Sequence, residues 1–138
     1  MPVIEELICT EQDGTISFGN YKLGQKAKKS DFEYEGDIYK VKTYNEITKL
    51  ERNDMFVYES VPGTVAEHFR VRDEGVEFTV EGSKDAQITV QLENDADYEV
   101  YVNDVAIGSM TTNMSGKLSV SVELEEGVSV KVRAVKRA

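Results

Sequence analysis

The chain of 138 residues is long enough for a domain with a real hydrophobic core. Its 26 acidic and 16 basic side chains give a net charge of −10 at pH 7, which opposes binding to nucleic acid or to an anionic membrane. One cysteine and one histidine exclude an intramolecular disulfide and a zinc site built from these residue types. Because the apolar runs are also too short for a membrane span, we expect a cytoplasmic protein that uses no metal or other cofactor.

The first half of the sequence predicts strands with irregular patterns. Segments 4–10 and 15–21 flank the turn sequence Asp13-Gly14 and predict a hairpin. The lysine-rich segment 22–30 is interpreted as a solvated loop or a single helical turn, with an anion-binding role as the alternative. Aromatic and β-branched residues then predict three more strands, at 31–34, 38–44 and 55–61.

A domain boundary is predicted near Pro62, the only proline after Pro2. It divides the chain into an N-terminal β subdomain, residues 1–63, and a C-terminal β-sandwich-like subdomain, residues 64–138. Alternatively, the proline forms a corner between two sheets of one domain, because halves of this size are near the lower limit for independent stability.

The second half of the sequence shows clean alternation of apolar and polar residues, as expected for half-buried strands. A first hairpin is predicted around Asp73-Glu74-Gly75; with Glu74-Gly75 as the turn, Arg72 faces Glu77 and His68 faces Glu81 on the solvent side. A second hairpin is predicted to pair the strands at 117–125 and 128–133.

Turn sequences recur at the spacing of short strands along the whole chain. This punctuation predicts an all-β fold of about ten short antiparallel strands, arranged as a sandwich or small barrel of two packed subdomains.

No combination of residues in the sequence predicts catalysis. Cys9 lies in a strand-like segment without basic neighbours and is interpreted as a structural thiol. His68 is expected on a wet strand face, where a bystander role is more common than general-base catalysis. The acidic segment 93–97 lacks the glycine and distal glutamate of an EF-hand and is interpreted as a turn.

Two groups of residues are candidates for ligand binding. Four tyrosines in the first half could present ring faces to a sugar or a partner, although core and cross-strand packing is the favoured interpretation because strands favour aromatic residues with or without a ligand: Tyr34, Tyr39, Tyr44 and Tyr58. Met110 and Met114 lie in a predicted polar loop, 110–116, which is the first loop candidate for a contact surface. A plain solvated connection is the favoured interpretation of this loop, because most loops bind nothing.

Parts of the sequence resemble known families. The segment 98–108, followed by 116–132, resembles PEGA and other immunoglobulin-like accessory modules. Over its whole length, including 14–21 and 56–64, the chain is similar to short uncharacterised bacterial proteins sometimes labelled "endosialidase". That label implies cleavage of polysialic acid, for which an arginine cluster and a tyrosine nucleophile are expected. No catalytic residue is assigned from the resemblance.

These observations support two hypotheses of different classes. The first is a non-catalytic binding or assembly module of a bacterial cell, with a protein partner or a second copy of itself. The alternative is a protein that binds or cleaves carbohydrate, directed at sialoglycans.

Overall fold

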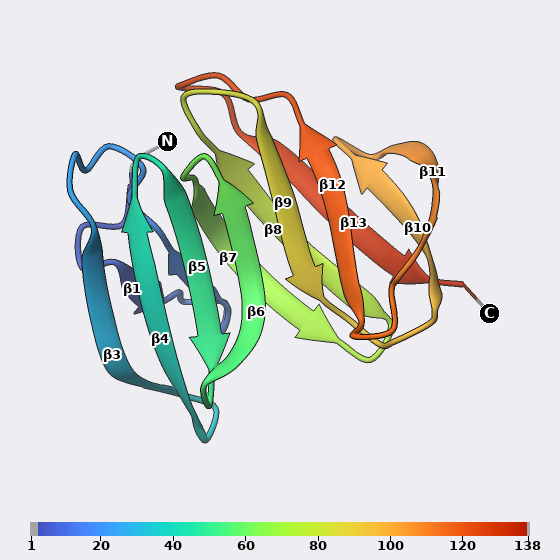
Figure 1. Ribbon diagram of the computed structural model, residues 1–138, viewed down its shortest axis with the longest axis horizontal. Coiled ribbons are helices and arrows are strands. Elements are labelled where there is room, and N and C mark those ends of the chain that lie inside the picture. The colour runs from blue at the N-terminus through green and yellow to red at the C-terminus, as the bar shows by residue number, and fades with distance from the viewer. Residues whose placement is uncertain (1–2, 138) are drawn as a thin grey trace.

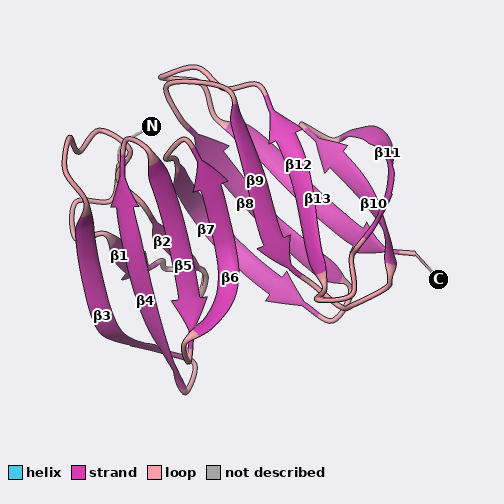
Figure 2. Cartoon of the chain, viewed as in Figure 1, coloured by secondary structure: helices cyan, strands magenta, loops and turns pink. Residues whose placement is uncertain are grey.

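The computed structural model describes residues 3–137, which form two antiparallel sheets packed face to face (Figures 1 and 2). In spatial order, the seven-stranded sheet contains β1 (Ile8–Thr10), β2 (Ile16–Phe18), β7 (Val65–Arg72), β8 (Gly75–Glu81), β13 (Val130–Lys136), β10 (Asp97–Val102) and β11 (Val105–Thr111). The six-stranded sheet contains β12 (Lys117–Val122), β9 (Ala86–Gln91), β6 (Met55–Val61), β5 (Ile47–Arg52), β4 (Asp37–Tyr44) and β3 (Ala27–Tyr34).

The all-β, antiparallel prediction is confirmed, with 13 strands rather than about ten. Both sheets are open, so the fold is a sandwich and not a barrel. Within the described residues no helix could span a membrane.

Alternation of apolar and polar side chains places the core between the sheets. In β12, for example, Leu118, Val120 and Val122 are buried while the serines between them are exposed. Inward residues of this kind from both sheets form one large cluster of buried side chains. Four rings meet edge-on or tilted at its centre, with centroids 5.0 to 5.9 Å apart: Phe18, Tyr58, Phe69 and Phe78.

The chain passes from the six-stranded sheet to the seven-stranded sheet at Pro62, between β6 and β7. Each sheet contains strands from both sides of this corner, because β2 is paired with β7 and β6 with β9. Continuous hydrogen bonding therefore crosses the predicted boundary at residue 63. Whether the two halves form separate folding units stays a prediction.

Buried hydroxyl groups satisfy one another beneath this corner. The Thr64 hydroxyl is 2.7 Å from the hydroxyls of both Tyr58 and Ser60, and the Thr48 hydroxyl donates to the Thr64 carbonyl oxygen at 2.8 Å. Thr43 extends the network, with its hydroxyl 2.8 Å from that of Thr48. These polar side chains are buried at little cost because each has a hydrogen-bonding partner.

The predicted register of the β7–β8 hairpin is wrong. The turn is Asp73-Glu74, so Arg72 pairs with Gly75, and Arg70 lies opposite Glu77. A bulge between Glu67 and Arg70, with a φ of 53° at His68, shifts the preceding residues by one position. Glu81 is consequently paired with Val65 rather than His68, and it is buried, accepting hydrogen bonds from the Tyr21 hydroxyl and the Gly127 N–H.

The second predicted hairpin is also wrong, because β12 and β13 lie in different sheets. β12 pairs with β9, whereas β13 lies between β8 and β10. The seven residues between β12 and β13 cross from one sheet to the other. The alternation of apolar and polar residues in β12 and in β13 predicts two strands but does not show that they belong to different sheets.

Several strand segments were absent from the sequence prediction, among them β5, β9 and the first half of β3. β5 was missed because its burial does not follow the polarity of its residues. The polar Thr48 faces the core, whereas the apolar Ile47 is only partly buried. β3 begins at Ala27, so Lys28 and Lys29 belong to a strand and not to the predicted loop or helical turn.

Candidate functional site

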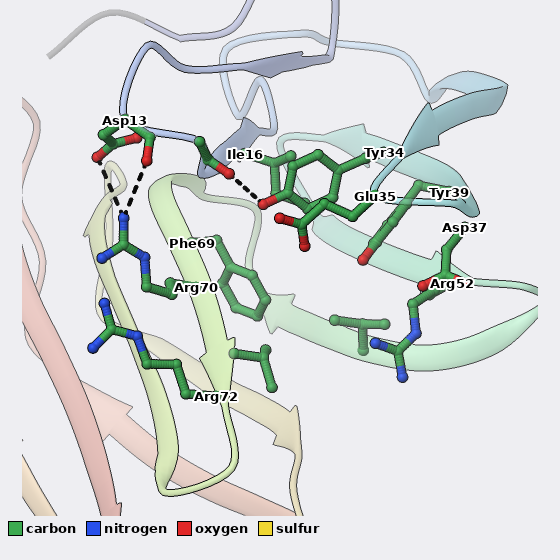
Figure 3. Close-up of a pocket in the computed structure, with 13 residues that line it drawn as sticks. Asp13, Ile16, Tyr34, Glu35, Asp37, Tyr39, Arg52, Phe69, Arg70 and Arg72 are labelled. Atoms are coloured by element: carbon green, nitrogen blue, oxygen red, sulfur yellow. Dashed lines mark hydrogen bonds and ion pairs between the residues drawn. The ribbon is translucent and has the colours of Figure 1, made fainter.

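A pocket of about 400 Å³ opens between the two sheets (Figure 3). Apolar side chains from three different strands line its inner part: Ile16 of β2, Val57 of β6 and Phe69 of β7. The turns β1–β2 and β3–β4 contribute to the rim. The pocket therefore exists because hairpin turns from both sheets meet at this end of the sandwich.

Two tyrosines form one wall of the pocket. Tyr34 ends β3 and Tyr39 lies in β4, with ring centroids 5.7 Å apart and ring planes at 66°. The Tyr34 hydroxyl donates a hydrogen bond to the carbonyl oxygen of Gly14 across the pocket mouth, as Figure 3 shows. Burial raises the pKa of both phenols, so both remain protonated at neutral pH.

Three of the five arginines of the chain line the same pocket. The Arg70 Nη2 atom is 3.9 Å from Asp13 Oδ2, and Arg72 Nη1 is 3.9 Å from Glu74 Oε1. Arg52, at the end of β5, interacts with the Tyr39 phenol and forms no ion pair with a carboxylate among the described residues. Arg70 Nη2 also donates to the Asp13 carbonyl oxygen at 3.4 Å. None of these contacts is a bidentate pairing with a carboxylate, so each guanidinium group keeps N–H donors for an incoming anion.

Asp13 lies at the rim of the pocket, beside Arg70. Its Oδ1 accepts a hydrogen bond from the Thr15 N–H at 3.1 Å, and its Oδ2 lies 3.0 Å from His68 Nδ1. Hydrogen bonds from the Thr15 side chain and N–H, with a smaller contribution from His68, lower the pKa of Asp13 from 3.8 to about 2. This carboxylate is therefore ionised at neutral pH and is not a proton donor.

The lowered pKa of Asp13 predicts a contribution to acid stability. A carboxyl group with a folded-state pKa below its unfolded value stabilises the fold above pH 3.8, and the stabilisation is lost as the pH falls towards 2. We expect Asp13→Asn to lower the melting temperature at pH 6 and to flatten its decline between pH 4 and 2. Asp73→Asn, in an exposed turn, is the control with the same charge change. Parallel declines of wild type and D13N would contradict the assignment.

The structure separates the residues that the sequence proposed for ligand binding. Tyr34 and Tyr39 lie together in the pocket. Tyr44, at the other end of β4, is half-buried opposite Ile47, and Tyr58 is 0 % exposed in the core, with no ring face open to a ligand.

The two methionine candidates also lie apart. Met110 belongs to β11 and packs against the core, so the polar loop begins only at residue 112. Met114 lies in that loop and is 85 % exposed.

Sequence reasoning missed the charged residues of the pocket, in particular Arg52, Arg70 and Arg72. They lie in two strands of different sheets, and nothing in their spacing relates them. The available signal was the turn sequences Asp13-Gly14 and Glu35-Gly36-Asp37, because the turns of antiparallel hairpins can gather at one end of a sandwich.

Groups that could perform nucleophilic or metal chemistry are not assembled in this pocket. Cys9 lies outside the lining, and partial burial together with Glu11 raises the pKa of its thiol. Among residues 3–137, no group of three histidine, cysteine or carboxylate side chains is placed to hold a metal ion. The arrangement instead suits recognition of an anion beside an apolar or aromatic surface.

Comparison of the chain with protein-family models, with curated proteins and with solved structures found no match.

Proposed function

We propose that this protein is a non-catalytic binding module whose pocket takes a small ligand carrying a carboxylate, with an acidic sugar as the ligand class. The observation that carries the proposal is the gathering of Arg52, Arg70 and Arg72 around a pocket walled by Tyr34 and Tyr39. A cytoplasmic location is part of the proposal, because a chain with one cysteine needs no oxidising compartment.

The chemistry of the lining supports a ligand that is partly anionic and partly apolar. A guanidinium group binds a carboxylate through two parallel N–H donors, which gives both affinity and orientation. The tyrosine rings and Phe69 offer surface to the C–H face of a sugar ring. A volume of about 400 Å³ lies within the range of small-molecule pockets.

The charge balance of the pocket also favours an anion relative to the rest of the surface. Its three arginines equal its three carboxylates, Asp13, Glu35 and Asp37, whereas the whole chain carries a charge of −10. The pocket is thus locally less negative than its surroundings, which favours entry of an anionic ligand here over other sites.

Cleavage of a sialylated glycan is the second candidate, since arginines and a tyrosine lie together as the endosialidase resemblance implies. The hydrogen bonding and protonation of Tyr34 and Asp13 favour binding over cleavage. The Tyr34 hydroxyl is engaged by the Gly14 carbonyl and its pKa is raised, which opposes the phenolate that a nucleophile requires. Asp13 is held ionised and supplies no proton to a leaving group.

The proposal is tested by isothermal titration calorimetry with sialic acid, its uncharged methyl ester and glucose. We expect saturable binding of sialic acid alone, and about a 100-fold loss in an Arg70→Gln, Arg72→Gln variant, from roughly 10-fold per charge-assisted contact. Arg137→Gln is the control, because Arg137 contacts Ser109 away from the pocket.

Three outcomes would overturn parts of this proposal. Equal binding of the methyl ester would exclude the arginine–carboxylate contact. Release of free sialic acid from a sialylated oligosaccharide, lost in Tyr34→Phe, would replace binding with cleavage. No binding to any acidic sugar by folded protein would leave a protein partner or self-association as the function to pursue.

A further inference from the structure

A second cationic feature lies on the outer face of the six-stranded sheet, away from the pocket described above. The strands β3, β4 and β5 lie side by side there, at the left of Figure 1. Four lysines, which we call the lysine platform, surround a hollow of about 100 Å³ together with Glu51: Lys28, Lys40, Lys42 and Lys49.

The strand register places three of these lysines in one row. Lys28 is directly opposite Lys42, and Lys42 is directly opposite Lys49. Side chains that are directly opposite in neighbouring strands have Cβ atoms about 5 Å apart, and like charges in such positions are destabilising. Lys42 therefore faces a like charge on both sides.

The acidic residues nearby neutralise this row only in part. Glu51 pairs with Lys40, with Oε1 3.2 Å from Nζ. Glu59 is directly opposite Lys49 in the register, so Lys49 has an acidic neighbour on one side. Within the described residues no ion pair is formed by Lys28 or Lys42. Lys28 and Lys42 thus lie opposite each other without an ion pair, on a chain with ten more acidic than basic side chains.

Locally unfavourable arrangements, such as like charges on neighbouring strands, commonly occur at functional sites. An anion with more than one charged oxygen would turn the repulsion within the row into attraction, because one ligand would contact two or three ammonium groups. We propose that the lysine platform binds a compact multivalent oxyanion, of the phosphate, pyrophosphate or sulfate class.

The dimensions and the charge of the protein favour a compact ligand over a long polyanion. The row spans three strands, about 10 Å across, which is close to the screening length at physiological ionic strength. Within that distance a small anion experiences mainly the lysines. A nucleic acid or a membrane extends beyond the row and meets the negative charge of the remaining surface.

The experiment is a titration of the full chain with phosphate, pyrophosphate and sulfate at constant ionic strength. Melting temperature and amide NMR shifts are measured for wild type, Lys42→Thr and Lys131→Thr. Lys131 is the matched control because it lies in a strand of the other sheet, 3.7 Å from Glu77 and 3.6 Å from Asp104. Since phosphate and sulfate stabilise folded proteins generally, the difference between variants is the informative quantity.

The expected result has two parts. Without anion at low salt, K42T melts about 1–4 °C above wild type because repulsion is relieved, whereas K131T melts below wild type. With anion, wild type and K131T show saturable stabilisation with amide shifts in β3, β4 and β5, and K42T binds at least about 10-fold more weakly.

Several results would overturn the proposal. They are equal stabilisation of wild type and K42T, amide shifts outside the platform, or an effect that sodium chloride reproduces. Tighter, Lys42-dependent binding of RNA or of anionic phosphatidylserine vesicles would replace the compact ligand with a macromolecular one. Because none of these lysines lines the tyrosine–arginine pocket, either site can fail its test without affecting the other.

Discussion

Replacing Tyr58 with alanine is expected to lower the free energy of unfolding by about 3–5 kcal/mol, the range for a fully buried aromatic side chain. The ring is 0 % exposed and contacts Phe18, Phe69 and Phe78 edge-on, so its removal leaves a cavity at the point where the two sheets meet. The three surrounding rings come from β2, β7 and β8 of the opposite sheet, where they hold one another in place and cannot collapse fully into the space.

A second variant at this position separates the ring from its hydroxyl. Tyr58→Phe keeps the ring but removes a hydrogen bond to Thr64, and it is expected to cost about 1 kcal/mol because Ser60 still contacts the Thr64 hydroxyl. Burial raises the pKa of Tyr58 to about 12, so the phenol is neutral throughout such measurements. Urea unfolding at pH 7 gives both values. A cost below about 1 kcal/mol for Y58A would contradict the central position of this ring.

The next largest effect is expected at Gly75, the first residue of β8. Its φ is 147°, and a Cβ atom there would lie 1.8 Å from the carbonyl oxygen of Ala134 in β13. The obstacle is backbone of a neighbouring strand, so it cannot be relieved by turning a side chain. Gly75→Ala is expected to lower the free energy of unfolding by about 3 kcal/mol or more, from the clash and the backbone strain together.

Gly108 in β11 provides the control for this substitution. Its φ of 130° is similarly unfavourable for other residues, but a Cβ atom there would meet nothing within 4 Å. Gly108→Ala therefore measures the backbone strain alone, at about 1–3 kcal/mol. Equal costs for G75A and G108A, measured by urea unfolding, would show that β8 and β13 can separate without loss.

The strands were largely predictable because their residues alternate between core and solvent. Leu118, Val120 and Val122 show this pattern plainly, and all three are buried. The same pattern carries no information about which strand is the neighbour. β12 and β13 were therefore predicted as a hairpin although they lie in opposite sheets.

The ligand-binding candidates illustrate the same limit. Tyr34, Tyr39 and Tyr58 all occur in strand-like segments of the first half. Only the arrangement of the sheets places Tyr58 among core rings and the other two at the pocket. The pocket arginines come from β5 and β7, which belong to different sheets, and their proximity is a property of the folded chain alone.

The lysine platform arises in a similar way. Lys28 belongs to the basic segment for which an anion-binding role was an alternative, but its neighbour Lys42, and Lys49 beyond it, come from later strands. Side chains with no relation in sequence become a row once the strands pair, because cross-strand neighbours are about 5 Å apart.

By itself, then, the sequence determined the class of the fold, since a two-residue period of apolar side chains can bury one face only as a strand. It also excluded a disulfide framework and a cysteine–histidine zinc site through the residue types that it lacks. The tertiary structure alone decided the strand partners, the register at the His68 bulge and the grouping of the arginines and tyrosines. These depend on contacts between residues far apart in the chain, which local patterns of polarity do not encode.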